Sequence, residues 1–239
     1  MAIQWFPGHM HKAIKAMRQQ LSTVDVLLEV IDSRCPASSQ NPVINEWLEH
    51  KPSLKLLNKV DLAGSEATQH WLHHINQQAN TRALALQANV LTPSMQTQIL
   101  RHCRELTNTP SSYAKPLCIA VVGIPNVGKS TLINQWLGRN IANTGNEPAI
   151  TKQQQLIRLQ APQDDVVLLD NPGMLWSKFL TEHIGYRLAI TGAIRETAMD
   201  YQEVAFYLLD YLLAQHPDAL TQRYGATVTQ ATTIEQSFT

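Results

Sequence analysis

Short apolar runs alternate with polar, helix-patterned stretches over roughly the first hundred residues. The apolar runs are rich in Val, Leu and Ile and end in polar residues, as buried parallel strands do; they span 24–34, 53–61 and 81–88. The stretches between and after them suit helices, the last of which has a Thr-Pro start; they span 41–51, 68–79 and 92–106. The first half of the chain therefore predicts consecutive βα units.

The polar stretch 107–116 interrupts this alternation with two prolines and a Ser/Thr run, which marks a linker. After it come an apolar strand, a helix, a polar loop containing Gly and Pro, and two further strands; they span 117–123, 130–138, 140–152, 154–159 and 165–170. Both halves together predict an α/β fold, with a doubly wound, mostly parallel sheet and helices on both faces.

The two ends of the chain differ from this middle part. Near the N-terminus, apolar positions recur at helical spacing opposite basic ones, which predicts a basic amphipathic helix; they are Ile14, Met17 and Leu21 against Lys12, Lys15 and Arg18. Beyond residue 177 the pattern is wholly helical, with amphipathic stretches at 183–194 and 201–216. We therefore expect an N-terminal basic segment and helix (1–20), a central domain (21–176) and a C-terminal helical appendage (177–239).

Composition narrows the class of protein further. A chain of 239 residues with 44% apolar content can bury a sizeable core. Basic and acidic residues balance at 19 each, so no overall charge points to nucleic acid or a membrane. Three widely spaced cysteines without a CxxC pair argue against a disulfide framework or a zinc site. No signal-type or membrane-spanning run is found, so we expect a cytoplasmic protein with no membrane partner.

The stretch "GIPNVGKS" (123–130) fits the phosphate-loop pattern GxxxxGK[ST], and it lies between a predicted strand and a predicted helix. In such a loop, backbone N–H groups and the helix dipole bind phosphate, the Lys reaches the β- and γ-phosphates, and the Ser hydroxyl binds Mg²⁺. The predicted phosphate-binding residues are Asn126, Val127, Gly128, Lys129, Ser130 and Thr131, together with Gly173 from the next motif.

That next motif is "DNPG" (170–173), which ends an apolar strand. Its aspartate would hold the Mg²⁺ water shell, and its glycine N–H would contact a γ-phosphate. Thr151, in the polar loop before it, is the best candidate for a switch threonine that binds Mg²⁺, although a turn-forming role is an alternative. The predicted Mg²⁺ site is therefore Ser130, Thr151 and Asp170.

"NKVD" (58–61) also ends a strand and predicts which base is bound. A carboxylate accepts hydrogen bonds from both N1–H and the exocyclic amino group of guanine, whereas adenine offers no such donor pair. The third strand ends in "LALQAN", where a backbone N–H could cap the base. The predicted guanine-binding residues are Asn58, Lys59, Val60, Asp61, Gln87 and Ala88, and the predicted ligands are GTP and GDP.

The base-reading motif precedes the phosphate loop, the reverse of the usual order in guanine-nucleotide domains. This order predicts a circularly permuted P-loop G domain, with 107–116 joining the former ends. Such a change costs little because domain termini generally lie at the surface and close together. It also makes the DNPG segment lead directly into the C-terminal helices, so their position would depend on the bound nucleotide.

Six stretches together resemble one protein family: "IQWFPGHMHKA", "VIDSRCPASSQNP", "LNKVDLA", "GIPNVGKSTLIN", "DNPGMLW" and "RLAITGAI". Over roughly residues 1–225 the chain is similar to the circularly permuted GTPases of the ribosome biogenesis GTPase A type. The resemblance implies Mg²⁺-dependent GTP hydrolysis during late assembly of the bacterial large (50S) ribosomal subunit, with its rRNA and proteins as partners. Two departures are a C-terminal region shorter than in relatives, and Asn171 where Thr is common.

The catalytic group is not evident from the motifs. Met174, Leu175 and Trp176 follow Gly173, and none can orient the attacking water as a Gln does in Ras-like enzymes. The resemblance points to His9, for which a structural or RNA-facing role is an equal alternative, or to a group from the ribosome. Asn126 resembles the residue through which related GTPases bind K⁺ near the phosphates, which predicts faster turnover with K⁺.

Three functions are therefore considered. The prediction is a monomeric GTPase switch, slow alone and stimulated by the ribosomal subunit and K⁺. The first alternative is a GTP-dependent ribosome-binding module with negligible hydrolysis. The second is an ATP-using P-loop kinase or ATPase, which the guanine-reading motif opposes.

Overall fold

A single six-stranded sheet forms the centre of the molecule, in the order β3-β2-β1-β4-β6-β5. The computed structural model describes residues 3, 5–48, 50–107, 116–138, 154–160 and 165–224. The strands are β1 (Val26–Asp32), β2 (Ser53–Asn58), β3 (Thr81–Ala85), β4 (Leu117–Val122), β5 (Gln155–Gln160) and β6 (Asp165–Asp170). Neighbouring strands are parallel except for β5, which is antiparallel to β6. The predicted α/β class with a mostly parallel sheet is confirmed.

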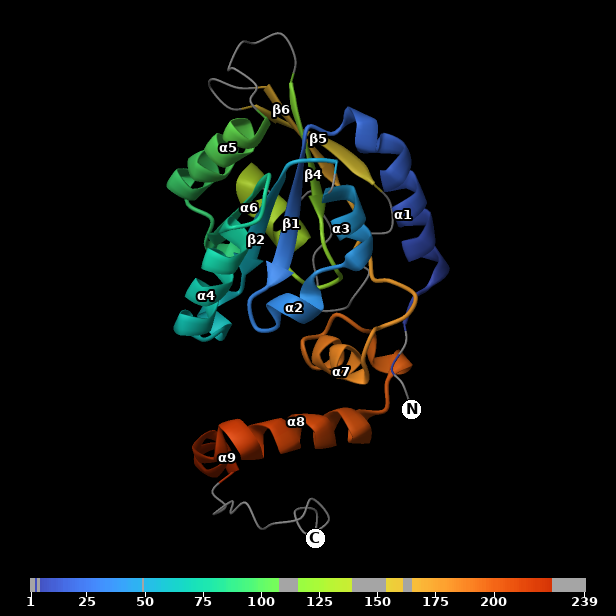
Figure 1. Cartoon of the computed structure of the whole chain (residues 1–239), viewed down its shortest axis with the longest axis vertical. Helices are drawn as coiled ribbons and strands as arrows, with labels where there is room; N and C mark the ends of the chain where they lie inside the picture. Colours follow the sequence, from blue (N-terminus) through green and yellow to red (C-terminus); the bar gives the residue numbers. More distant parts are fainter. Residues whose placement is uncertain are drawn as a thin grey trace.

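Helices cover both faces of this sheet (Figure 1). They are α1 (Gly8–Gln20), α2 (Pro36–Ser39), α3 (Pro42–Leu48), α4 (Ser65–Asn76), α5 (Pro93–Thr107), α6 (Lys129–Leu137), α7 (Glu182–Ile190), α8 (Tyr201–Gln215) and α9 (Pro217–Tyr224). Four short 3₁₀ turns add to them: η1 (Leu21–Thr23), η2 (Val60–Leu62), η3 (Ala88–Val90) and η4 (Glu196–Ala198).

The core has two layers because successive strand residues point to opposite faces. On β1, Leu28 belongs to the layer that α5 and α6 cover, whereas Leu27 belongs to the layer that α1 and α3 cover. All seven residues of β1 are buried. This explains why the strand reads as one continuous apolar run rather than as an alternating pattern.

A buried ion pair lies inside the second layer, where the sequence pattern predicts only a strand. Lys55 on β2 is the register partner of Glu29 on β1, and its Nζ lies 3.2 Å from Glu29 Oε2. The same ammonium donates to Gln40 Oε1 at 2.7 Å. Burial raises the pKa of Glu29, and the neighbouring Lys55 opposes that shift. The pair ties the segment between α2 and α3 to the middle of the sheet.

The carboxyl ends of β1, β2, β4 and β6 meet at one edge of the sheet. In Figure 1 the arrowhead of β1 points to this edge, toward α2 and α7. From β1 the chain continues to β2 and β3 on one side of β1, and it then returns to form β4, β5 and β6 on the other side. In open α/β sheets this reversal opens a crevice in which ligands bind.

The C-terminal helices depart from the sequence pattern in two ways. The predicted helix over 183–194 ends early, because Gly192 adopts a positive φ of 78° just after the Thr191 C-cap. The predicted amphipathic face of α8 buries none of its residues, and Figure 1 shows α8 crossing below α7, away from the sheet. Within the described ranges, no helix is both long and apolar enough to span a membrane.

Candidate nucleotide-binding site

An open cavity of about 490 Å³ lies at the carboxyl edge of the sheet. Its lining residues are Arg34, Asn58, Lys59, Asp61, Leu62, Gln87, Ala88, Asn89, Asn126, Gly128, Thr131 and Thr191. They come from the carboxyl end of β2, from the segments that follow β1, β2, β3 and β4, from the first turn of α6 and from the end of α7. The cavity thus collects the predicted base-reading loop, the predicted base cap and part of the predicted phosphate loop in one place.

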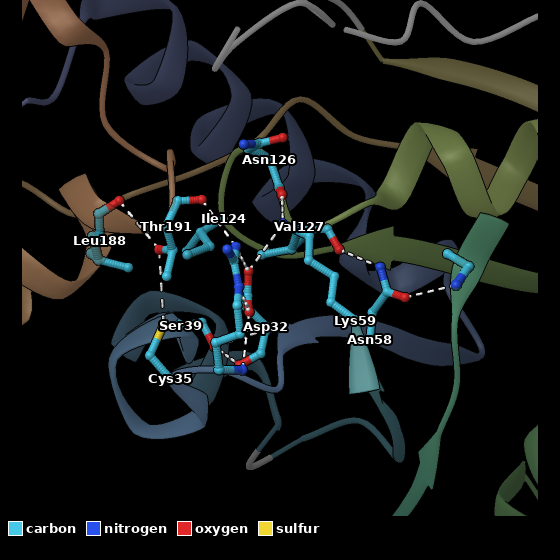
Figure 2. A network of polar contacts seen from close by, with 12 residues as sticks. Asp32, Cys35, Ser39, Asn58, Lys59, Ile124, Asn126, Val127, Leu188 and Thr191 are labelled. Atoms are coloured by element: carbon cyan, nitrogen blue, oxygen red, sulfur yellow. Dashed lines mark hydrogen bonds and ion pairs between the residues drawn. The ribbon is translucent and has the colours of Figure 1, made fainter. Parts of the chain in front are cut away.

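Asn58 joins the base side of the cavity to the phosphate loop. Its Nδ2 donates to the carbonyl of Val127 at 2.7 Å, and its Oδ1 accepts the Ala88 N–H at 2.7 Å (Figure 2). The side chain is buried, so both bonds are made away from water. Asn58 therefore braces the base-reading loop against the phosphate loop and the predicted base cap.

Lys59 makes a second link between the base-reading loop and the phosphate loop. Its Nζ donates to the carbonyl of Asn126 at 2.7 Å. Its backbone is left-handed, with φ of 63°, and this turns the chain from β2 into η2, which carries Asp61. A left-handed non-glycine residue is strained, by about 1 kcal/mol or more, and persists where surrounding contacts hold it.

The phosphate loop has the glycine geometry that its motif requires. Gly128 has a φ of 101° and is the N-cap of α6. A Cβ on Gly128 would overlap the Asn58 amide, so this position needs glycine both for its conformation and for its close approach to the base-reading loop. Gly128 and Thr131 both line the cavity, so the N-terminus of α6 lies at its wall, where backbone N–H groups are suited to bind phosphate.

Lys129 and Asp170 lie beneath this loop and do not line the cavity wall. The Lys129 ammonium is folded back onto the Ile124 carbonyl at 2.8 Å. Burial lowers the pKa of Lys129 to about 8, and the nearby Asp170 opposes that change. Burial likewise raises the pKa of Asp170 to about 6, against the opposing charge of Lys129.

Asp170 fits a role in holding a cation. It is fully buried, and neither of its carboxylate oxygens has a side-chain hydrogen-bond partner among the described residues. An ionised carboxylate without partners is costly away from water. Carboxylate and hydroxyl oxygens are ligands that Mg²⁺ accepts, so Asp170 and Ser130, in the first turn of α6, form a suitable donor set.

The rest of the DNPG motif is packed against the phosphate loop. A Cβ on Gly173 would lie 2.6 Å from the Pro125 Cα, so the two segments touch backbone to backbone. The Met174 N–H donates to the Gly123 carbonyl at 3.2 Å. Asn171, where Thr is common, is buried and donates to the carbonyls of Val121 and Leu169, which makes it a brace between β4 and β6.

The remaining predicted residues lie outside the cavity wall or outside the described ranges. Val60 begins η2, and Val127 is buried behind the loop. His9 lies in the first turn of α1 and does not line the cavity. Thr151 lies outside the described residues, so its predicted role as a switch threonine stays a prediction.

Sequence reasoning missed Asp32, Arg34 and Thr191. Arg34 and Thr191 line the cavity, and Asp32 contacts Lys59 (Figure 2). Asp32 ends β1 in the stretch "VIDSR", so the same rule that located the other motifs, polar residues at the carboxyl end of a strand, could have found it.

Comparison with known families agrees with this geometry. The family model described as "50S ribosome-binding GTPase" matches residues 118–234. The match contains the phosphate loop and the DNPG motif. The base-reading motif precedes the matched residues in the sequence, as expected for a permuted order.

Similar proteins cover nearly the whole chain. Ribosome biogenesis GTPase A of Priestia megaterium is 43% identical over 94% of this chain and 79% of its own length. The protein of that name from Bacillus pumilus is 41% identical over 95% of this chain and 81% of its own length. Mitochondrial ribosome-associated GTPase 1 of Mus musculus is 35% identical over 89% of this chain and 67% of its own length.

Proposed function

The chain belongs to the ribosome biogenesis GTPase A family, and from this membership we propose that it acts as a GTP-driven switch in late assembly of the large (50S) ribosomal subunit. As a member of this family it is a guanine-nucleotide-binding GTPase. The proposed partners are the rRNA and proteins of that subunit, and the proposed acting form is a cytoplasmic monomer.

The observation that carries this proposal is the single cavity shared by the base-reading and phosphate loops. Asp61 would accept hydrogen bonds from guanine N1–H and its amino group. Gln87 and Ala88 would cap the base, and the Lys59 stem would cover its face. Gly128 and Thr131 line the other end of the same cavity, where the phosphates would meet the start of α6.

Mg²⁺ would be held by Ser130 and Asp170, with Thr151 as a further proposed ligand. When bound, the ion would neutralise charge on the phosphates. The chain's own part is to supply an ionised carboxylate at Asp170 and an ammonium at Lys129. Both are buried next to the loop that binds the phosphates.

Hydrolysis needs a group that the DNPG segment does not supply. Met174 and Leu175 are fully buried and apolar, so they cannot orient water. We propose that His9 or a ribosomal group performs this step, and that Asn126 holds a K⁺ ion near the phosphates. Hydrolysis by the protein alone would then be slow.

The same burial of Met174 and Leu175 favours a second candidate, a GTP-dependent ribosome-binding module with negligible turnover. A GTPase assay with purified large subunits and their assembly precursors, in KCl and in NaCl, separates the two. The switch predicts stimulation on the order of 100-fold or more, greater with K⁺. Nucleotide-dependent subunit binding without single-turnover hydrolysis would favour the module.

His9→Ala tests the catalytic group in the same assay, with His11→Ala, on the exposed side of α1, as the matched control. A catalytic His9 predicts a stimulated rate lowered by about 100-fold in His9→Ala and unchanged in the control. An unchanged stimulated rate in His9→Ala would reject the catalytic role while leaving the switch intact.

A further inference from the structure

Asp32 lies between the base-reading loop and the C-terminal helices, and none of the predicted nucleotide-binding motifs contains it. It ends β1, where its register partner is Asn58 on β2. Its carboxylate is buried, with 3% of the side chain exposed. Oδ1 accepts the Arg34 backbone N–H at 3.1 Å and Arg34 Nε at 2.9 Å, and Oδ2 accepts Arg34 Nη2 at 2.6 Å.

Lys59 adds a second cation to this carboxylate, since its Nζ lies 3.0 Å from Asp32 Oδ2. Burial alone would raise the pKa of Asp32, but the Arg34 hydrogen bonds and the charges of Lys59 and Arg34 outweigh it and hold that pKa below its ordinary value. Asp32 is therefore ionised near neutral pH. It compensates two cations at the rim of a cavity that would receive phosphates.

The Lys59 ammonium is consequently held from two sides, by Asp32 and by the Asn126 carbonyl (Figure 2). A lysine side chain in water samples many rotamers, and fixing it in one of them costs conformational entropy. Two charge-assisted contacts compensate this cost before any nucleotide arrives. Removing the carboxylate would leave one contact to hold both the ammonium and the strained turn at Lys59.

Arg34 extends the same network to α7. Its Nη2 donates to the Thr191 carbonyl at 3.1 Å, and Thr191 is the C-cap of that helix. A cation is favourable there, because the last carbonyls of a helix lack partners within it. The following residue, Gly192, touches the phosphate loop, since a Cβ on it would lie 2.7 Å from Asn126 Nδ2.

We propose that Asp32 and Arg34 are positioning residues for the nucleotide cavity. Asp32 holds Lys59 on the phosphate loop, and Arg34 joins that pair to the carboxyl end of α7. This inference rests on the proposed nucleotide site. It adds a direct route by which a ligand in the cavity reaches the C-terminal helices, separate from the chain connection through the DNPG segment.

A double-mutant cycle tests the first step. The affinity for fluorescent mant-GDP with Mg²⁺ is measured for the full chain, Lys59→Met, Asp32→Asn and the double variant. If Asp32 acts through Lys59, Asp32→Asn weakens binding about five- to tenfold alone and has no further effect in the Lys59→Met background. A purely structural role of Asp32 would instead give effects that multiply, and this result would overturn the proposal.

The cycle also distinguishes a failure of this inference from a failure of the proposed nucleotide site. Unchanged affinity in Lys59→Met would overturn the proposed nucleotide site. Reduced affinity in Lys59→Met with unchanged affinity in Asp32→Asn would overturn the positioning role alone. Glu46→Gln is the matched control. It breaks an exposed ion pair between Arg18 on α1 and Glu46 on α3, outside the cavity, and should leave the affinity for mant-GDP unchanged.

Arg34→Lys tests the second step, the link from Asp32 through Arg34 to α7. It keeps the positive charge, so it remains a usable test if Asp32→Asn folds poorly. A lysine cannot make the forked contact with Asp32 and reach Thr191 together. Hydrogen exchange is followed at the amides of Gly192 and Ala193, which bond back to α7. Mant-GDP should slow this exchange severalfold in the original chain and not in Arg34→Lys. Equal protection by mant-GDP in both proteins would overturn the link.

Discussion

The base side and the phosphate side of the cavity are built differently. On the base side, Asn58 and Lys59 satisfy their polar groups with other parts of the chain. On the phosphate side, Lys129 and Asp170 are buried behind the cavity wall with pKa values shifted toward neutrality, and Asp170 has no side-chain hydrogen-bond partner among the described residues. The base side is therefore held in shape by the chain itself, whereas the proposed phosphate side holds buried charges that a bound nucleotide and cation would compensate.

The largest effect is expected where the ligand supplies the missing charge. Lys129→Ala removes the ammonium that would meet the phosphates in a site shielded from water, and should weaken mant-GDP binding by about 1,000-fold. Lys178→Ala, an exposed lysine in the same chain, is the control and should change little. Affinity for mant-GDP within about threefold of the original chain in Lys129→Ala would contradict the proposed phosphate site.

A smaller loss of affinity is expected on the base side, where Asp61 is proposed to recognise the guanine and the surrounding loops are already held in place. Asp61→Asn exchanges a double acceptor for an amide, so GDP affinity should fall about 50-fold and xanthosine diphosphate should be bound better than GDP. Competition titrations with both nucleotides measure the change. Equal loss for the two bases would show that Asp61 supports the loop rather than reading the base.

The smallest effect concerns pH. The folded pKa of Asp170, about 6, lies above its ordinary value of 3.8, so the folded chain keeps this proton between those pH values after the unfolded chain has lost it. Its contribution to stability is complete below pH 3.8 and is lost as the pH rises through 6. The nucleotide-free protein should lose about 1 kcal/mol of unfolding free energy between pH 5 and pH 7 from this group.

Thermal unfolding of the original chain and of Asp170→Asn at both pH values isolates this contribution, because other titrating groups are common to the two proteins. The pH-dependent difference between them should disappear when Mg²⁺ and GDP are bound and keep the carboxylate ionised. A difference that persists with ligand would mean that Asp170 does not face the cation.

Much of the fold could be predicted because the signals were local. Val/Leu/Ile runs ending in "NKVD", "GIPNVGKS" and "DNPG" identify strands and their carboxyl ends, and these ends share an edge in a parallel sheet. That Asp61 and Gly128 line one cavity follows from this rule. Their contacts with nucleotide stay predictions.

The parts that could not be predicted depend on contacts between distant segments. Nothing local shows that Lys55 is buried against Glu29, since a charged residue in an apolar run is usually solvated. The α8 pattern is apolar on one side, yet periodicity does not say what covers a helix, and no residue of α8 is buried. The contact between Asp32 and Lys59 was missed because these two residues lie far apart in the sequence and are brought together only by the fold.

A structure of the full chain with Mg²⁺ and GDP tests the central claim most directly, because it shows whether the two differently built sides serve one ligand. The account predicts a single GDP whose guanine meets the Asp61 carboxylate and whose β-phosphate meets the Lys129 ammonium and the first turn of α6. GDP bound with its base away from Asp61, or in the neighbouring cavity lined by α2, α7 and α8, would contradict it.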